Sequence, residues 1–183
     1  MEIVKKKTNI KIVKTFLVVI FGTILLTLSA KIKIPFYPVP MTMQTFVVLF
    51  MGLAFGWRIG VLTISLYLLE GIMGLPVFAG TPEKGIGLIY FTGPTMGYLI
   101  GFLAATFLAG YMNFHDNIFL IFVKLTLCVS TIYIFGILWL GTLIGWDKPI
   151  LQLGVFPFLL AELFKILLLA FLANKIVKLK KFI

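Results

Sequence analysis

The amino-acid sequence predicts an all-α integral membrane protein, a compact bundle of six transmembrane helices with long outward-facing loops. Of its 183 residues, 61% are hydrophobic and 12% are charged, whereas soluble domains average about 45–50% apolar and about 25% charged residues. The apolar residues form long runs, and lysines gather near both ends of the chain. This composition excludes a soluble globular domain, and it excludes a disordered chain because disorder requires low hydrophobicity.

Six apolar runs predict the six spans, since a spanning helix needs about 20 mostly apolar residues. The first run follows a basic segment, and the next segment, 31–40, holds three prolines that exclude a helix interior. A tight turn is predicted at Trp57 and Arg58, and the polar stretch over 76–92 predicts a long loop. Shorter polar segments separate the last three runs. The predicted spans cover 16–30, 41–55, 60–75, 93–112, 118–143 and 155–177.

Six spans place both ends of the chain on one side of the membrane. That side then carries ten Lys and Arg residues, against four on the opposite side. Because cytoplasmic segments are enriched in Lys and Arg, both termini are predicted to be cytoplasmic, and Glu83 in the longest loop is predicted to be external. The chain is thus expected to form one transmembrane domain, 1–183, in the bilayer of the cell membrane, with short basic tails at about 1–15 and 178–183.

The residues that are missing exclude several function classes. The net charge of +10 comes from terminal lysine clusters rather than from a basic face, so nucleic acid is not expected as a partner. The sequence has no phosphate-binding loop, no Gly-x-Ser-x-Gly elbow, one cysteine and one histidine. We therefore expect no enzyme, no metal site and no cofactor. Cys128 is predicted to be an inert apolar filler, and His115 a solvated loop residue.

Charged residues inside the apolar runs are the strongest functional signal, because charge at membrane depth is costly. Glu162 and Lys165 are three residues apart in the last run and share one helix face. They form either an ion pair that fixes helix register or the polar lining of a substrate pocket, and we favour the pocket. Glu70 is either a loop anchor or a pocket wall. Lys124 is predicted to extend toward the interface.

Glycine rows and loop aromatics complete the candidates. Gly52, Gly56 and Gly60 repeat at every fourth residue, as do Gly93, Gly97 and Gly101, and such rows predict close helix packing. Gly93 also opens a span beside an outer loop, where it can shape a pocket. The aromatic residues of the outer loops are either anchors at the membrane interface or a cover over an apolar ligand.

Four segments together resemble the BioY family, the biotin-specific substrate-capture components of energy-coupling-factor transporters. Residues 39–46 read Val-Pro-Met-Thr-Met-Gln-Thr-Phe and resemble the family's Val-Pro-x-Thr-x-Gln-Thr-Phe stretch. Residues 74–80 and 93–102 match two further family segments in order. In the last span, Pro157 with Glu162 and Lys165 resembles the family's Pro-x-x-x-x-Asp-x-x-Lys pattern, with glutamate in place of aspartate.

The resemblance implies six helices and a biotin site near the outer face, covered by the first and third outer loops. Lys165 would pair with the biotin carboxylate or the ureido carbonyl, whereas Glu162 and Gln44 would accept from the ureido N–H groups. Aromatic rings would pack on the ligand's rings. The predicted substrate-binding residues are Thr42, Gln44, Phe78, Phe91, Gly93, Tyr98, Glu162 and Lys165.

The resemblance also implies partners, a transmembrane coupling subunit and the ATPase subunits of an energy-coupling module. Small residues of the first spans, Thr23, Thr27, Gly52 and Gly56, are the predicted docking contacts, and packing within the chain is their alternative. The family's first helix often carries an Ala-x-x-x-Ala row, for which this chain has Thr23 and Thr27. The alternative function is a solitary secondary transporter or channel for a small vitamin-like molecule. A membrane enzyme is less favoured because no nucleophile–base set is present.

Overall fold

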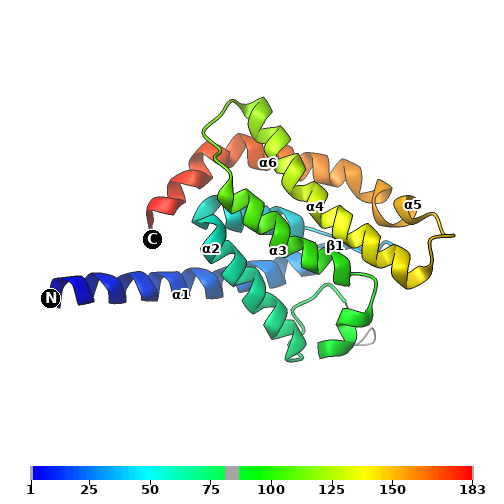
Figure 1. Cartoon of the computed structure of the whole chain (residues 1–183), viewed down its shortest axis with the longest axis horizontal. Coiled ribbons are helices and arrows are strands. Elements are labelled where there is room, and N and C mark those ends of the chain that lie inside the picture. Colours follow the sequence, from blue (N-terminus) through cyan, green and yellow to red (C-terminus); the bar gives the residue numbers. More distant parts are fainter. Residues whose placement is uncertain (1, 81–86, 183) are drawn as a thin grey trace.

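The structure is a computed structural model that describes residues 2–80 and 87–182, with side chains for residues 10–80 and 87–181. It is mostly helical (Figure 1). Four helical stretches in the described residues are long and apolar enough to cross a membrane: Ile10–Lys31, Gln44–Ile72, Ile118–Ile144 and Ile150–Lys181. A shorter apolar helix covers Met96–Tyr111. The predicted class, a helical membrane protein, is confirmed at this level.

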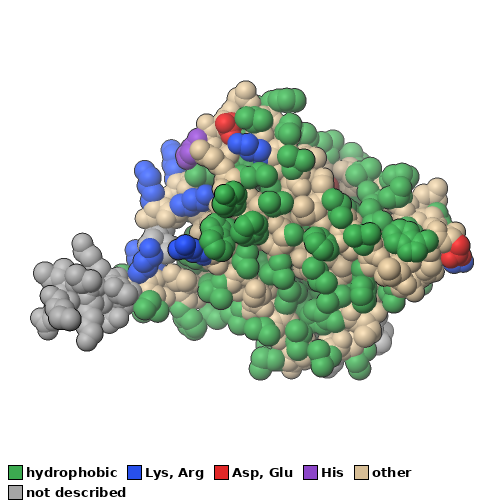
Figure 2. All heavy atoms as spheres, in the orientation of Figure 1, with side chains coloured by type: hydrophobic (Ala, Val, Ile, Leu, Met, Phe, Trp, Pro, Cys, Tyr) green, Lys and Arg blue, Asp and Glu red, His purple; other side chains and the backbone are tan. Residues whose placement is uncertain are grey.

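The surface agrees with a lipid environment. Hydrophobic side chains are spread over the face seen in Figure 2, and most of the Lys and Arg residues gather at the end where both termini lie. Large apolar residues on the last helix are widely exposed, including Phe164 at 66% and Phe171 at 70%. Such exposure is favourable in hydrocarbon and costly in water.

Helix α1 covers Glu2–Lys31 and begins far before the predicted start of the first span at residue 16. Its 30 residues extend about 45 Å at 1.5 Å per residue, which exceeds the roughly 30 Å of a bilayer's hydrocarbon core. In Figure 1 the first part of α1 extends beyond the other helices. The segment predicted as a basic tail is therefore helical from Glu2 onward.

A small hairpin follows α1. Strands β1 (Lys33–Ile34) and β2 (Met41–Thr42) pair antiparallel, with Lys33 opposite Thr42 and Ile34 opposite Met41. The predicted extended loop over 31–40 is thus largely a hairpin connection, an exception in an otherwise helical chain. The hairpin returns the chain to the end of the bundle, where Thr42 leads directly into the next helix.

Helix α2 covers Gln44–Ile72 and contains a break at Gly56, with φ +80° and ψ 170°. The tight turn predicted at Trp57 and Arg58 is wrong, because both residues are helical and the direction changes one residue earlier. Positive φ favours glycine because it has no Cβ. In Figure 1 the cyan first part and the teal second part of α2 run in different directions.

The remaining elements complete the bundle. Helix α3 packs against both α2 and α4, and its glycines permit this: a Cβ on Gly101 would lie 2.6 Å from Ile132 Cα. A Cβ on Gly110 would lie 2.2 Å from the Trp57 backbone nitrogen. The predicted close packing at Gly101 is therefore present. The elements after α2 are η2 (Gly87–Thr92), α3 (Met96–Tyr111), α4 (Ile118–Ile144), α5 (Ile150–Gly154), η3 (Phe156–Phe158), α6 (Leu159–Ile176) and η4 (Val177–Phe182).

Candidate ligand-binding site

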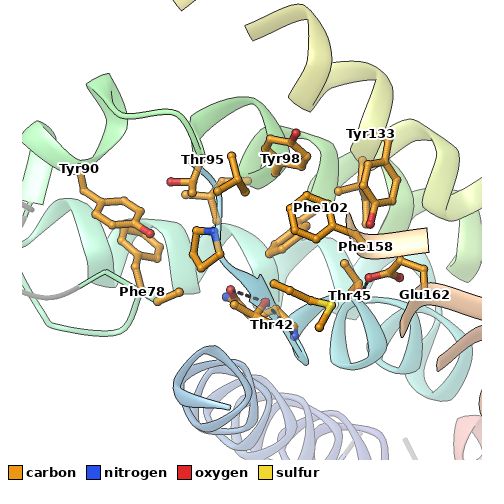
Figure 3. Close-up of a pocket in the computed structure, with 17 residues that line it drawn as sticks. Thr42, Thr45, Phe78, Tyr90, Thr95, Tyr98, Phe102, Tyr133, Phe158 and Glu162 are labelled. Atoms are coloured by element: carbon orange, nitrogen blue, oxygen red, sulfur yellow. Dashed lines mark hydrogen bonds between the residues drawn. The ribbon is translucent and has the colours of Figure 1, made fainter. Parts of the chain in front are cut away.

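An inner cavity of about 560 Å³, part of it open to the surface, lies where the hairpin meets α2, α3, α4 and α6. Figure 3 shows side chains from segments far apart in the sequence directed toward this space. Most of the lining is apolar or aromatic. It consists of Val39, Pro40, Met41, Thr42, Gln44, Thr45, Phe78, Ala79, Tyr90, Thr95, Tyr98, Leu99, Phe102, Ile132, Tyr133, Phe158 and Glu162.

A buried ion pair lies at one end of the inner cavity. Lys165 Nζ donates to Glu162 Oε1 at 2.7 Å, to Thr45 Oγ1 at 3.0 Å and to the Thr42 carbonyl oxygen at 2.6 Å. An ammonium group has three N–H donors, so these contacts use all of them. Lys165 is therefore satisfied by the protein, and it is not among the lining residues. In the structure Lys165 contacts Glu162 from outside the lining of the inner cavity.

The two oxygens of Glu162 differ. Oε1 accepts from Lys165 and from the Thr45 hydroxyl at 2.8 Å. Oε2 is buried and has no hydrogen-bond partner among the residues that the structure describes. Native proteins satisfy nearly all buried polar atoms, so Oε2 lacks a donor that a ligand can supply. Tyr133 lies at the same end of the cavity (Figure 3), and its hydroxyl can donate or accept.

A chain of hydrogen bonds occupies the polar groups of Thr42 and Gln44. The Thr42 hydroxyl donates to Gln44 Oε1 at 3.2 Å, and Gln44 Nε2 donates to the Tyr67 hydroxyl at 2.7 Å. Tyr67 in turn donates to the Val77 carbonyl oxygen at 3.0 Å. Thr42 and Gln44 line the inner cavity, and the hydrogen bonds of their side chains described above are made within the protein.

Aromatic rings form the opposite wall. Phe78 stacks on Tyr90, with ring centroids 4.7 Å apart, and packs edge-to-face on Phe91 at 5.5 Å. Phe78 lines the inner cavity, whereas Phe91 lies behind it and is not a lining residue. Burial raises the pKa of the Tyr90 phenol, which therefore stays neutral at physiological pH. Tyr98 also lines the cavity, and its hydroxyl donates to the Gly154 carbonyl oxygen at 2.8 Å.

A second, outer cavity of about 720 Å³ adjoins the first. It is lined by residues of the hairpin and by Gly93, whose carbonyl oxygen accepts from Trp139 Nε1 at 2.9 Å. Gly93 therefore contributes to the outer cavity instead of the inner one. The two cavities share Pro40, Ala79, Tyr90 and Thr95.

Of the eight residues predicted to bind substrate, five line the inner cavity and three lie next to it. Sequence reasoning missed Thr45, Thr95 and Tyr133 as site residues. Thr45 lies in the quoted 39–46 segment, which was the available signal, whereas Tyr133 is a single aromatic residue in a long apolar run. The five lining residues are Thr42, Gln44, Phe78, Tyr98 and Glu162.

The residues predicted to dock a partner divide into two pairs. Thr23 is buried, with 3% of its surface exposed. A Cβ on Gly52 would lie 2.7 Å from the Thr106 carbonyl oxygen. Both residues therefore pack within the chain, as the alternative interpretation proposed. Thr27 and Gly56 remain partly exposed.

Other predicted polar residues lie away from the inner cavity. Glu70 is half-buried near the end of α2 and does not line the cavity. Lys124 forms an ion pair with Asp116, and it also donates to the Asn113 carbonyl oxygen at 2.7 Å. Glu83, predicted to be external, lies outside the described residues.

Comparisons with known proteins agree on one family. The sequence model described as the BioY family matches residues 4–182. A probable biotin transporter BioY from Pyrococcus horikoshii is 36% identical over 77% of this chain and 82% of its own length. The biotin transporter BioY from Thermotoga maritima is 33% identical over 86% of this chain and 92% of its own. A 2.1 Å crystal structure of the S-component for biotin from an ECF-type ABC transporter superposes with a TM-score of 0.78, at 25% identity, over 93% of this chain and 94% of that one.

Proposed function

This chain belongs to the BioY family, and we propose that it captures biotin in the inner cavity for uptake across the cell membrane. One observation supports the assignment to this cavity: Oε2 of the buried Glu162, which lies beside Tyr133, makes no hydrogen bond among the described residues. Biotin has a ureido ring with two N–H groups, and one of them is the donor that Oε2 lacks. A charge-assisted hydrogen bond of this kind is about twice as strong as one between neutral groups.

The rest of the lining suits the remainder of biotin. Its fused thioether ring is apolar and fits against Phe78, Tyr98 and Phe158, because aromatic faces offer large apolar contact areas. The hydroxyl of Tyr133 can donate to the ureido carbonyl. Lys165 orients the carboxylate of Glu162 through its hydrogen bond to Oε1, and we assign it a supporting role instead of direct contact.

Equilibrium binding to the purified chain in detergent tests this function. We expect saturable binding of tritiated biotin near one molecule per chain, with competition by unlabelled biotin. Removing the ureido N–H groups from the ligand, by methylating both nitrogens, should abolish competition. Absence of saturable binding by a folded, monodisperse sample would contradict the proposal.

A six-helix count follows if α2 is taken as two spans. The break at Gly56 lets the two parts of α2 cross the membrane separately, and α1, α3, α4 and α6 supply the other four. We propose that these form one transmembrane domain. The family is one of transporter components, so no enzymatic activity and no cofactor are proposed.

An even number of spans places both termini in the cytoplasm under the positive-inside rule. The expected result is that Lys148→Cys, in a Cys128→Ala background, reacts with a membrane-impermeant maleimide in intact cells. Lys180→Cys should react only after the cells are permeabilised. Both positions are exposed in the structure, so access is set by sidedness. The reverse pattern of labelling would overturn the proposed orientation.

A further inference from the structure

The backbone segment Pro76–Ala79 is held by side chains. Lys31 Nζ donates to the Pro76 carbonyl oxygen at 2.7 Å and to that of Phe78 at 2.8 Å. Lys33 Nζ donates to the Ala79 carbonyl oxygen at 2.5 Å. The carbonyl between them, Val77, accepts from Tyr67. Four consecutive carbonyl groups are thus bound by side chains, and within the described residues none accepts from a backbone N–H.

This segment forms a wall of the ligand site. Phe78 and Ala79 line the inner cavity, and Ala79 is also one of the four residues shared with the outer cavity. Both side chains are buried. The lysines that hold the segment come from the end of α1 and from β1, elements about 45 residues earlier in the chain. A displacement of Pro76–Ala79 would therefore open the boundary between the two cavities.

We infer that Lys31 and Lys33 act as positioning residues that clamp the Pro76–Ala79 wall and thereby slow the release of bound ligand. An ammonium–carbonyl hydrogen bond is stronger than a neutral one, and three of the four carbonyl groups in the segment accept such a bond. The segment has no strand neighbour to replace them. Loss of the clamp should raise the rate of opening, so the dissociation rate changes more than the association rate.

Two other roles for Lys31 and Lys33 predict different effects of their removal on the binding rates. If they only steer an anionic ligand toward the site, their removal would slow association in a salt-dependent manner and leave dissociation unchanged. If they only anchor the chain in lipid head groups, their removal would have no effect on rates in detergent. The inference rests on the proposed biotin function for its kinetic readout, so a second readout without ligand is required.

The kinetic test measures tritiated biotin exchange on the full chain in detergent. Lys31→Met with Lys33→Met is expected to raise the dissociation rate about tenfold, with little change in the association rate. Lys31→Arg with Lys33→Arg retains the donors and should keep dissociation slow. Lys148→Met is the matched control, since Lys148 is exposed and contacts Asp147 at 3.3 Å. The inference would be overturned by an unchanged dissociation rate in the double methionine variant, including the case in which only the association rate falls.

The second readout is the reactivity of Ala79→Cys toward maleimide in a Cys128→Ala background. Ala79 is 4% exposed, so labelling should be slow with both lysines present and about tenfold faster when both are methionine. Faster labelling without any biotin binding by the wild type would support the clamp and refute the proposed function. Equal labelling rates would refute the clamp, whatever the binding result.

Discussion

Replacing Lys165 with methionine is expected to abolish biotin binding while the chain still inserts into the membrane. The substitution leaves the buried Glu162 carboxylate without its cation, at a cost of about 3–5 kcal/mol when one partner of a buried pair is removed. The carboxylate also loses the contact that orients it in the site. Its acceptor strength toward the ureido N–H falls, and we expect at least about a hundredfold loss of affinity. Equilibrium binding of tritiated biotin measures it.

Two further variants separate chemistry from folding. Lys124→Met removes an ion pair at the other end of the bundle, with Asp116, and should leave binding unchanged. The double substitution of Glu162 and Lys165 by methionine removes both charges, which is often tolerated for a buried pair, and should restore stability without restoring binding. Wild-type affinity in Lys165→Met would show that Glu162 needs no partner, and our assignment of the site would be wrong.

Accumulation of biotin is expected to depend on a separate ATPase-bearing module. The 183 residues contain no phosphate-binding loop, and delivery of a bound ligand against a gradient needs energy input. In cells that lack every energy-coupling module, we expect biotin to be bound up to the number of chains and not concentrated further. Uptake far above the external concentration in such cells would favour the solitary transporter.

The predicted docking of that module can be tested at one residue. Thr27 lies on α1, is partly exposed, and donates its hydroxyl to the Thr23 carbonyl oxygen, so it presents a small side chain. In cells that contain the module, Thr27→Leu should reduce uptake several-fold because a larger side chain prevents close helix approach. Biotin binding in detergent should be unchanged. Equal loss of binding and uptake would instead place Thr27 in the packing of the chain.

Helix boundaries were predictable where an apolar run and its neighbouring residues mark both ends of the helix. The run over 118–143 matches α4 to within one residue at each end, and Asn117 caps it by accepting from the Leu120 N–H at 2.9 Å. The roles of Gly52 and Gly56 could not be distinguished from the sequence, because both are glycines in the same row of every fourth residue. In the structure Gly52 packs against Thr106, while Gly56 breaks the helix.

The site was predictable where charge interrupts an apolar run, as at Glu162. The contacts of Lys165 were not, because two of its acceptors, Thr42 and Thr45, lie at least 120 residues away in the sequence. The contacts of Lys31 and Lys33 were also hidden, since their acceptors are backbone carbonyls, which every residue has. Their sequence positions indicate only positive charge at the end of a helix.

The location of bound biotin tests the central claim most directly. A structure of the chain determined with saturating biotin should show the ligand in the inner cavity, with a ureido nitrogen within about 3.2 Å of Glu162 Oε2. Lys165 should keep its contacts with Glu162 and Thr45. Biotin bound elsewhere, or an inner cavity with Glu162 Oε2 still without a donor, would contradict the account.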